Sequence, residues 1–426
     1  MTKRLLLNLC AVAFVSSTAL AGDWPSWRGP HGDGTASGTG FPVAWNAEKN
    51  VAWKHAISGL GASTPAVNNG LIFLTSVDKG QNLVTCLDFD GSLKWQTPVG
   101  AGVEGKPQKD GTGANPSPVA TSEHVFVYFK SGQFACLDRD GKVKWQSNLF
   151  ERFSEVTSES LWWDLGTSPV LTNDCVVVTL MHSGPSWLVA FEQQTGKLKW
   201  KHDRVTDAPV EAAQSYTTPI VTNTKEGQEV IIVTGADHVT CHSAVDGAEL
   251  WRVGGLNPDQ NGYFRSISSS VSANNMVVAP YARGGTLTAI RMGGAGDVTK
   301  SHVVWTREET SADVPTPTIA NKRVYVVRDV KQDRGTVDCL DLMTGKTIWT
   351  GQLPRHRLTF RASPIYADGR LYVTRQDGTV FVLDADGDEF RLLSENRVAD
   401  EHTVATPVLV DASILQRTER HVYMIR

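Results

Sequence analysis

The stretch CLDRDGKVKW (Cys136–Trp145) decides the fold, because a near copy, CLDFDGSLKW, occupies Cys86–Trp95. Looser versions follow, such as AFEQQTGKLKW (Ala190–Trp200) and CLDLMTGKTIW (Cys339–Trp349). Each joins two short β-prone runs through an Asp-Gly or Thr-Gly turn, which is the pattern of an antiparallel hairpin. A phrase that recurs along the whole chain indicates a repeat architecture rather than a single chemical site.

A second feature, a Ser/Thr-Pro step followed by a β-rich run, returns about every 50 residues. The steps are Thr64-Pro65, Ser117-Pro118, Ser168-Pro169, Thr218-Pro219, Thr316-Pro317, Ser363-Pro364 and Thr406-Pro407, and Ser269-Ser270 stands where an eighth is due. Each unit contains four strand-like runs, which is the content of one propeller blade. The sequence therefore predicts an all-β fold over residues 50–426, an eight-bladed β-propeller with four-stranded antiparallel blades.

The ends of the chain predict how the ring closes. The last unit stops at Arg426 after three strands, and an isolated strand-like run, NVAWK (Asn50–Lys54), precedes the first Thr-Pro step. We expect this N-terminal strand to complete the last blade, because the pairing would cover both open sheet edges.

When the units are aligned, two positions keep a similar residue type from unit to unit, and we call them the Trp column and the Cys column. Blades must bury their flanks against each other, and a Trp offers a large apolar face with one N–H donor. We interpret the Trp column as structural, docking one blade on the next: Trp53, Trp95, Trp145, Trp200, Trp251, Trp305 and Trp349. Leu392 is assigned to this column in the seventh unit, and the fifth unit carries the insertion GGAGDVTKS at 293–301. In the other column Cys trades with Ala, Val and Met, so these Cys residues are read as buried hydrophobes.

The unit Ala190–Trp200 matches the tryptophan-docking pattern of pyrroloquinoline quinone (PQQ) repeats, with Glu192 in place of the usual Asp. Over roughly residues 50–426 the chain resembles the PQQ-like, or quinoprotein-type, eight-bladed propellers. That superfamily includes PQQ-dependent alcohol dehydrogenases and the BamB-type outer-membrane assembly scaffold. The opening DWPSWRGPHGDG (Asp23–Gly34) looks like the N-terminus of exported members found in many bacteria.

The N-terminal residues predict export. Two positive charges, a short apolar run and small residues ending at Ala21 form the pattern of a signal peptide, cleaved after Ala21. We expect a monomeric periplasmic or secreted protein without a transmembrane anchor. Residues 22–49 are read as a strap that docks on the propeller near its closure. The net charge of −4 argues against nucleic acid as a partner.

The resemblance by itself does not imply that this chain binds PQQ or another cofactor of the family. PQQ-dependent dehydrogenases use a vicinal Cys-Cys disulfide, calcium ligands and an Asp base, and this sequence has no Cys-Cys pair. It also lacks a haem-attachment motif and the common hydrolase, phosphate-loop and zinc-protease motifs. We therefore predict no catalytic residue and no metal ligand.

Long connections between the last strand of one unit and the next Ser/Thr-Pro step should all emerge on one face of the ring. A rigid scaffold that positions loops in this way is a common basis for binding sites. A solvated rim and a mixed-charge, aromatic-lined funnel are both compatible with their composition. For the funnel, the candidate binding residues are Trp163, Asp164, Gln214, Tyr216, Arg265, Arg357, Arg361 and His402.

Three functions remain open from the sequence. The first is a non-catalytic binding or assembly scaffold for envelope proteins or cell-wall components. The second is a PQQ- and Ca²⁺-dependent oxidoreductase of alcohols or sugars, which would place PQQ and calcium in the channel. The third is a glycan-binding module that uses the aromatic rim.

Overall fold

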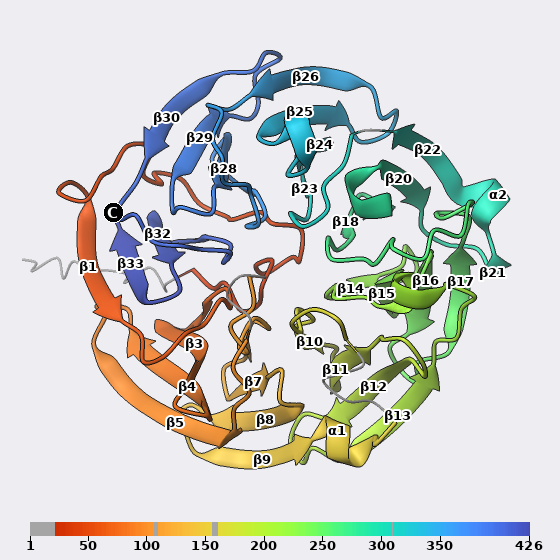
Figure 1. The fold of residues 1–426 in the computed structure, drawn as a ribbon, viewed down its shortest axis with the longest axis horizontal. Coiled ribbons are helices and arrows are strands. Elements are labelled where there is room, and N and C mark those ends of the chain that lie inside the picture. Colours follow the sequence, from red (N-terminus) through yellow and green to blue (C-terminus); the bar gives the residue numbers. More distant parts are fainter. Residues whose placement is uncertain (1–21, 106–109, 156–160, 309) are drawn as a thin grey trace, which may run out of the picture.

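The computed structural model describes residues 22–105, 110–155, 161–308 and 310–426, so the predicted signal peptide lies outside the described residues. In these residues eight sheets stand around one axis (Figure 1). Helical structure is limited to single turns: α1 (Leu149–Arg152), α2 (Thr299–His302), η3 (Val210–Ala213), η4 (Ala282–Gly284) and η5 (Lys331–Asp333). The predicted eight-bladed β-propeller is confirmed.

The first four blades follow the chain from the inner strand outward. Blade 1 comprises β2 (Ala66–Asn68), β3 (Leu71–Asp78), β4 (Gln81–Asp88) and β5 (Leu93–Ala101). Blade 2 comprises β6 (Val119–Ala120), β7 (His124–Tyr128), β8 (Gln133–Asp138) and β9 (Val143–Asn148). Blade 3 comprises β10 (Val170–Leu171), β11 (Cys175–Leu180), β12 (Trp187–Glu192) and β13 (Leu198–Asp203). Blade 4 comprises β14 (Ile220–Asn223), β15 (Glu229–Gly235), β16 (His238–Ser243) and β17 (Glu249–Val253).

The remaining blades keep the same order. Blade 5 comprises β18 (Val271–Ala273), β19 (Met276–Tyr281), β20 (Thr286–Arg291) and β22 (Val303–Glu308). Blade 6 comprises β23 (Thr318–Ala320), β24 (Arg323–Val327), β25 (Thr336–Asp341) and β26 (Thr347–Gln352). Blade 7 comprises β27 (Ile365–Ala367), β28 (Arg370–Thr374), β29 (Val380–Asp384) and β30 (Leu392–Asn396). Blade 8 comprises β31 (Val408–Val410), β32 (Ser413–Arg417), β33 (His421–Ile425) and the N-terminal β1 (Val51–Ala56).

The ring closes through β1, as the sequence predicted. β1 pairs antiparallel with β33, with Trp53 opposite Met424 and Ala56 opposite His421. The two ends of the propeller therefore share one blade, and the outer edge of β33 is covered. None of the helices in the described residues is long and apolar enough to cross a membrane.

The insertion after β20 adds a fifth strand to a neighbouring blade. Its residues form β21 (Gly296–Asp297), which pairs in parallel with β17 of blade 4, and then α2. The extra strand thus lies on the outside of the ring, away from the axis (Figure 1).

The Trp column lies on the outer strands, where each indole meets the next blade. Five of these indole N–H groups donate to a carbonyl in the turn of the following blade, at 2.8–3.1 Å: those of Trp53, Trp95, Trp145, Trp305 and Trp349. The Trp200 ring lies against Gly247 without a partner for its N–H, and Trp251 is buried in the core between blades 4 and 5. The Trp side chains therefore couple neighbouring blades.

The Cys column lies directly across the ladder from the Trp column, with Cys86 opposite Trp95 and Cys136 opposite Trp145. All five described Cys residues are buried and free. Burial raises the pKa of the Cys86 and Cys136 thiols to about 12, so they remain protonated. These side chains pack as small apolar groups.

The position assigned to Leu392 is wrong by two residues. Val382 lies opposite Ser394 and Leu383 opposite Leu392, with the bulge that the other blades also carry at this place, so Ser394 occupies the Trp column. The Ser394 hydroxyl donates to the carbonyl of Val43 in the strap. Blade 7 therefore meets the strap where other blades present a Trp. The column was misplaced because the turn of this blade is longer: Val382 and Ser394 are 12 positions apart, whereas Cys86 and Trp95 are 9 apart.

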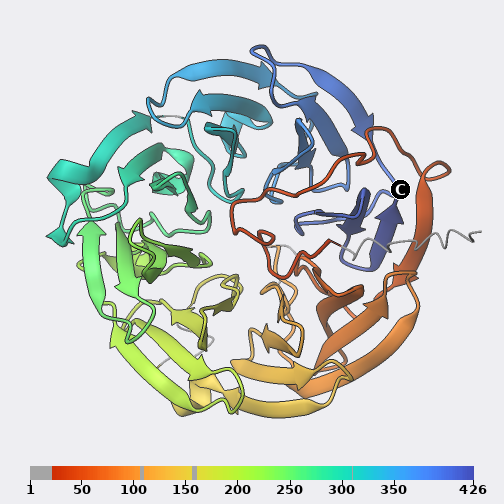
Figure 2. The same ribbon diagram turned by 180° about the vertical axis from the view of Figure 1, so that it is seen from behind.

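The strap, residues 22–49, crosses the blades on either side of the closure and reaches the centre of the ring (Figure 2). Trp24 pairs with Val67 of blade 1, and Trp45 is buried in a core cluster shared by blades 7, 8 and 1. Between them, the fully buried Arg28 donates to the carbonyls of Pro317 and Pro364 at 2.9 and 3.1 Å. The strap thus ties blades 1, 6, 7 and 8 together.

Candidate functional site

The Ser/Thr-Pro steps form a closed hydrogen-bonded ring around the channel. At each step the backbone N–H donates to the side-chain hydroxyl of the corresponding residue in the next blade, at 2.9–3.2 Å. The order is Thr64, Ser117, Ser168, Thr218, Ser269, Thr316, Ser363, Thr406 and again Thr64. A hydroxyl two residues before the inner strand is therefore needed in every blade, which explains the repeated residue type.

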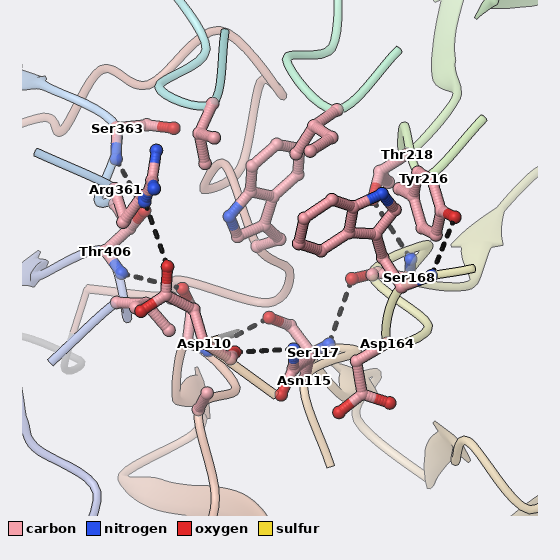
Figure 3. Close-up of a pocket in the computed structure, with 18 of the residues that line it drawn as sticks. Asp110, Asn115, Ser117, Asp164, Ser168, Tyr216, Thr218, Arg361, Ser363 and Thr406 are labelled. Atoms are coloured by element: carbon pink, nitrogen blue, oxygen red, sulfur yellow. Dashed lines mark hydrogen bonds and ion pairs between the residues drawn. The ribbon is translucent and has the colours of Figure 1, made fainter. Parts of the chain in front are cut away.

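Above this ring the channel opens into a cavity of ≈ 360 Å³, which we call the mouth pocket (Figure 3). Six ring residues line it together with loop residues such as Asp110 and Arg361. Trp27 of the strap lines the mouth pocket and also a second cavity of ≈ 500 Å³ on the strap side. The Trp27 side chain therefore divides the channel and forms the floor of the mouth pocket.

The aromatic wall of the pocket is held by the loops before blades 3 and 4. The Trp163 indole N–H donates to Glu211 Oε1 at 2.8 Å, and the Trp163 backbone N–H donates to the Tyr216 hydroxyl at 3.1 Å. That hydroxyl donates in turn to Gln214 Oε1 at 2.8 Å. Because Gln214 is fully buried, this chain of contacts fixes both aromatic side chains.

Ion pairs fix the charged wall. Arg265 makes a bidentate pair with Asp313 at 2.8 and 2.9 Å. Arg361 joins two carboxylates, Asp110 and Asp329, each at 3.0 Å. Since bidentate and bridging guanidinium contacts are directional, they hold these side chains in place and satisfy most of their charge.

Two groups behind this wall have perturbed pKa values. Hydrogen bonds to Asp110 and Glu419 raise the pKa of His402 to about 9, so the imidazole is charged at neutral pH. Burial, aided by the nearby charge of Asp313, raises the pKa of Asp329 to about 6. The charge on Asp110 is therefore balanced by two cations, Arg361 and His402.

One cation of the mouth pocket lacks such a partner. Arg283 lies in η4 with φ of 53°, between Ala282 at 55° and Gly284 at 83°. Left-handed backbone is unfavourable for residues with a side chain, and consecutive examples indicate a constrained segment. In the part of the chain that the structure describes, the Arg283 guanidinium makes no hydrogen bond or ion pair, although the residue lines the pocket.

The structure brings together most of the residues selected from the sequence. Five of them line the mouth pocket: Trp163, Asp164, Tyr216, Arg265 and Arg361. Gln214 and His402 lie one layer behind, in contact with the lining residues Tyr216 and Asp110. Arg357 is exposed and does not line the pocket; its backbone carbonyl accepts a hydrogen bond from Arg334.

Four contributions were missed from the sequence. The hydroxyl ring was visible as a repeated Ser or Thr, but its hydrogen bonds require neighbouring blades. Trp27 was assigned to a strap without a place in the channel, since nothing local directs it there. Asp110 and Arg283 belong to connections without a repeat signal, and only the closed ring places them beside the axis.

A family model described as outer membrane protein assembly factor BamB matches the chain over residues 32–205, 166–328 and 295–410. The chain belongs to the BamB family. No curated protein gives a significant match to this BamB-family chain.

Solved structures agree on the fold of this BamB-family propeller. BamB from Moraxella catarrhalis is 15% identical, with a TM-score of 0.58, and the match covers 87% of this chain and 97% of that one. A europium-containing methanol dehydrogenase gives 0.69 at 11% identity, covering 95% and 89%. Quinohemoprotein alcohol dehydrogenase from Comamonas testosteroni gives 0.63 at 13% identity, covering 95% and 80%. At such identities the likeness concerns the fold alone.

The residues of this BamB-family pocket do not fit a calcium–quinone centre. Its carboxylates are already engaged: Asp110 by Arg361 and His402, Asp164 by Lys130 at 3.3 Å, and Asp313 by Arg265. Among residues 22–426, apart from the undescribed gaps, no group of three or more His, Cys, Asp or Glu is placed to hold a metal ion. The five described Cys residues belong to separate strands in the blade cores, so no cysteine pair lies beside the pocket.

Proposed function

We propose that the chain is an exported, non-catalytic propeller that serves as a binding or assembly scaffold for envelope proteins or cell-wall components. The mouth pocket is its binding site. The observation that carries this proposal is a preformed pocket of ≈ 360 Å³ whose carboxylates are already paired with cations. Such a pocket is large enough for a small ligand group and needs no rearrangement to accept it.

The site offers recognition chemistry rather than proton-transfer chemistry. A general base must be free to take a proton, and the carboxylates of the wall are held by Arg265, Arg361 and Lys130. Fixed aromatic faces and fixed charges instead favour selective binding. Membership of the BamB family and the predicted signal peptide support a place in the cell envelope.

The proposal is tested by retention of envelope material. A purified chain of residues 22–426 is immobilised and exposed to solubilised envelope fractions, and the bound protein and polysaccharide are quantified. The variant Arg265→Gln/Arg361→Gln/His402→Gln changes the pocket wall, and we expect it to retain at most a tenth of the wild-type amount, since each change removes a charged contact. Equal retention by this variant, with an unchanged thermal midpoint, contradicts the proposal.

The matched control changes the same residue types outside the pocket. Arg355→Gln/His356→Gln/Arg357→Gln lies in one exposed connection, and we expect it to retain the wild-type amount. If the first triple variant fails to fold, Trp27→Leu removes the aromatic floor while keeping an apolar side chain, and the same loss is expected.

A quinoprotein oxidoreductase is the second candidate, favoured by the extensive structural match to the methanol dehydrogenase. The purified chain is mixed with PQQ and Ca²⁺, and dye reduction with alcohols and sugars is measured. We expect none, because the donor set of the pocket does not fit the cofactor. Dye reduction that depends on PQQ would replace the scaffold proposal with this one.

A further inference from the structure

The six ring hydroxyls that line the mouth pocket each have an unused proton. Every one accepts a backbone N–H from the preceding blade, and none donates to an acceptor among the described residues: Thr64, Ser117, Ser168, Thr218, Ser363 and Thr406. A hydroxyl accepts and donates at the same time, so its own proton remains available to a ligand. The neck of the channel therefore presents a circle of O–H donors.

Arg283 adds a charge to these donors. The other pocket-lining arginines, Arg265 and Arg361, are paired with carboxylates, and the guanidinium of Arg283 has no counter-ion in the described chain. Its left-handed backbone, followed by Gly284 packed against the Ala312–Asp313 backbone, holds η4 at the pocket. An anionic group on a ligand would supply the missing partner, most favourably a planar carboxylate.

The rest of the wall defines the body of the ligand. Trp27, Trp163 and Tyr216 offer aromatic surface, whereas Asp110, Asp164 and Asp313 keep oxygen lone pairs beyond those used by their cations. A matching ligand is compact, has one carboxylate, carries several hydroxyl groups that both donate and accept, and has an apolar ring face. A sugar acid combines these properties, whereas a peptide end brings backbone amides and an apolar side chain instead.

We propose that the mouth pocket binds an acidic sugar, with its carboxylate on Arg283 and its hydroxyl oxygens on the ring hydroxyls. This inference rests on the proposed function, and it names the ligand class of the same site. Because Trp27 closes the floor, the pocket accepts a single sugar acid or the end of an acidic chain rather than a continuous strand.

The test is calorimetric titration of the chain of residues 22–426 with D-glucuronate, D-glucose, acetate and a short oligouronide. D-glucuronate is expected to bind at least tenfold more tightly than D-glucose, which lacks the carboxylate, and than acetate, which lacks the ring. Tighter binding of the oligouronide identifies a polysaccharide end as the source, and equal binding identifies the free sugar acid. Equal affinity for D-glucose and D-glucuronate overturns the inference.

Variants of Arg283 test the charge. Arg283→Gln should weaken D-glucuronate binding at least tenfold and leave D-glucose binding unchanged, and Arg283→Lys should recover part of the loss. Arg355→Gln, which removes an exposed arginine, is the control and should not change either affinity. An unchanged D-glucuronate affinity in Arg283→Gln overturns the assignment.

Two serines of the ring provide a matched pair. Ser168 and Ser269 each accept one backbone N–H, at 2.9 and 3.0 Å, but only Ser168 lines the mouth pocket. Ser168→Ala and Ser269→Ala should lower the thermal midpoint by similar amounts, whereas only Ser168→Ala should weaken D-glucuronate binding, by about three- to tenfold. Equal losses of affinity in both variants contradict direct donation by the ring.

The two proposals fail in different ways. If D-glucuronate does not bind while retention of envelope material still depends on Arg265, Arg361 and His402, the acidic-sugar inference is wrong and the scaffold remains. If neither depends on the pocket, both are wrong. If a short peptide displaces D-glucuronate at equal or lower concentration, the ligand is a protein carboxyl terminus, and the inference is again wrong.

Discussion

Gly141 shows how one residue serves both its own hairpin and the neighbouring blade. Its φ of 82° lies in the left-handed region, where a side chain is unfavourable. A Cβ there would also lie 2.5 Å from the ring of Trp95 of the preceding blade. The turn glycine and the Trp of the repeated phrase are therefore two halves of one contact between blades.

Gly141→Ala should lower the free energy of unfolding by about 2–4 kcal/mol, the sum of backbone strain and overpacking against Trp95. Gly70→Ala is the control, because Gly70 has a similar φ of 73° and open space around it, so only about 1–2 kcal/mol is expected. Urea denaturation followed by tryptophan fluorescence measures both. Equal losses in the two variants would show that the contact with Trp95 adds nothing.

Through His402, the stability of the folded chain depends on pH. Its pKa is raised from 6.5 to about 9 in the folded chain, so its contribution to stability is complete below pH 6.5 and is lost as the pH rises through about 9. His402→Gln should therefore be less stable than wild type by about 1–2 kcal/mol at pH 6, after allowing for solvent screening. The difference should shrink toward pH 9.5, and thermal melts across that range measure it. A difference that stays constant with pH would contradict the ion pairs of His402, and His356→Gln is the exposed-histidine control.

At the scale of elements, the strap does more than cover the closure. Its central turn places the fully buried Arg28 against blades 6 and 7 and Trp27 in the channel. Burial lowers the pKa of Arg28 to about 9, and the carbonyl and hydroxyl acceptors around it replace the water that the charge has lost. An element without β-structure of its own thus determines the depth of the pocket.

Arg28→Met should lower the free energy of unfolding by about 2–4 kcal/mol, because contacts to Pro317, Pro364 and Thr318 are lost together. It should also speed proteolytic cleavage within residues 22–49. Thermal melts and timed digestion measure the two effects, with the exposed Arg355→Met as control. Wild-type stability combined with wild-type digestion would show that the strap is held by its apolar contacts alone.

At the scale of the whole molecule, the contacts that close the propeller run around the complete ring. The eight hydrogen bonds of the hydroxyl ring return to Thr64, and β1 returns to β33. A ring held at both its inner and outer radius leaves no free blade edge at the seam. The channel, and with it the pocket, exists only when all blades are in place.

Two truncations separate the strap from the closing strand. A chain starting at Glu48 keeps β1, and we expect it to stay monomeric with a lowered thermal midpoint. A chain starting at Ile57 lacks β1 and exposes β33, and we expect it to form oligomers by edge pairing. Light scattering after size exclusion measures both, beside the chain of residues 22–426. Monomers in both truncations would contradict the role of β1 as the cover of that edge.

Most of the architecture could be predicted from the sequence, because the same local sequence signals occur in every repeat unit. Hairpin turns, the Trp and Cys columns and the Ser/Thr steps each recur with the blade, and the isolated N-terminal strand fits the unfinished last blade. The Trp column of blade 7 was misplaced, because its turn is longer than in the other hairpins and only the strand pairing shows that Ser394 lies opposite Val382.

The sequence alone determined that this chain forms an eight-bladed ring closed by its N-terminal strand, because short-range turns and alternating strands are local properties. The tertiary structure decided that Trp27 forms the pocket floor, that Arg361 is paired and that Arg283 is not. These facts join residues hundreds of positions apart, such as Arg361 and Asp110. Only a closed ring brings such residues to one axis. No local sequence pattern shows which charged loop residues form ion pairs with one another.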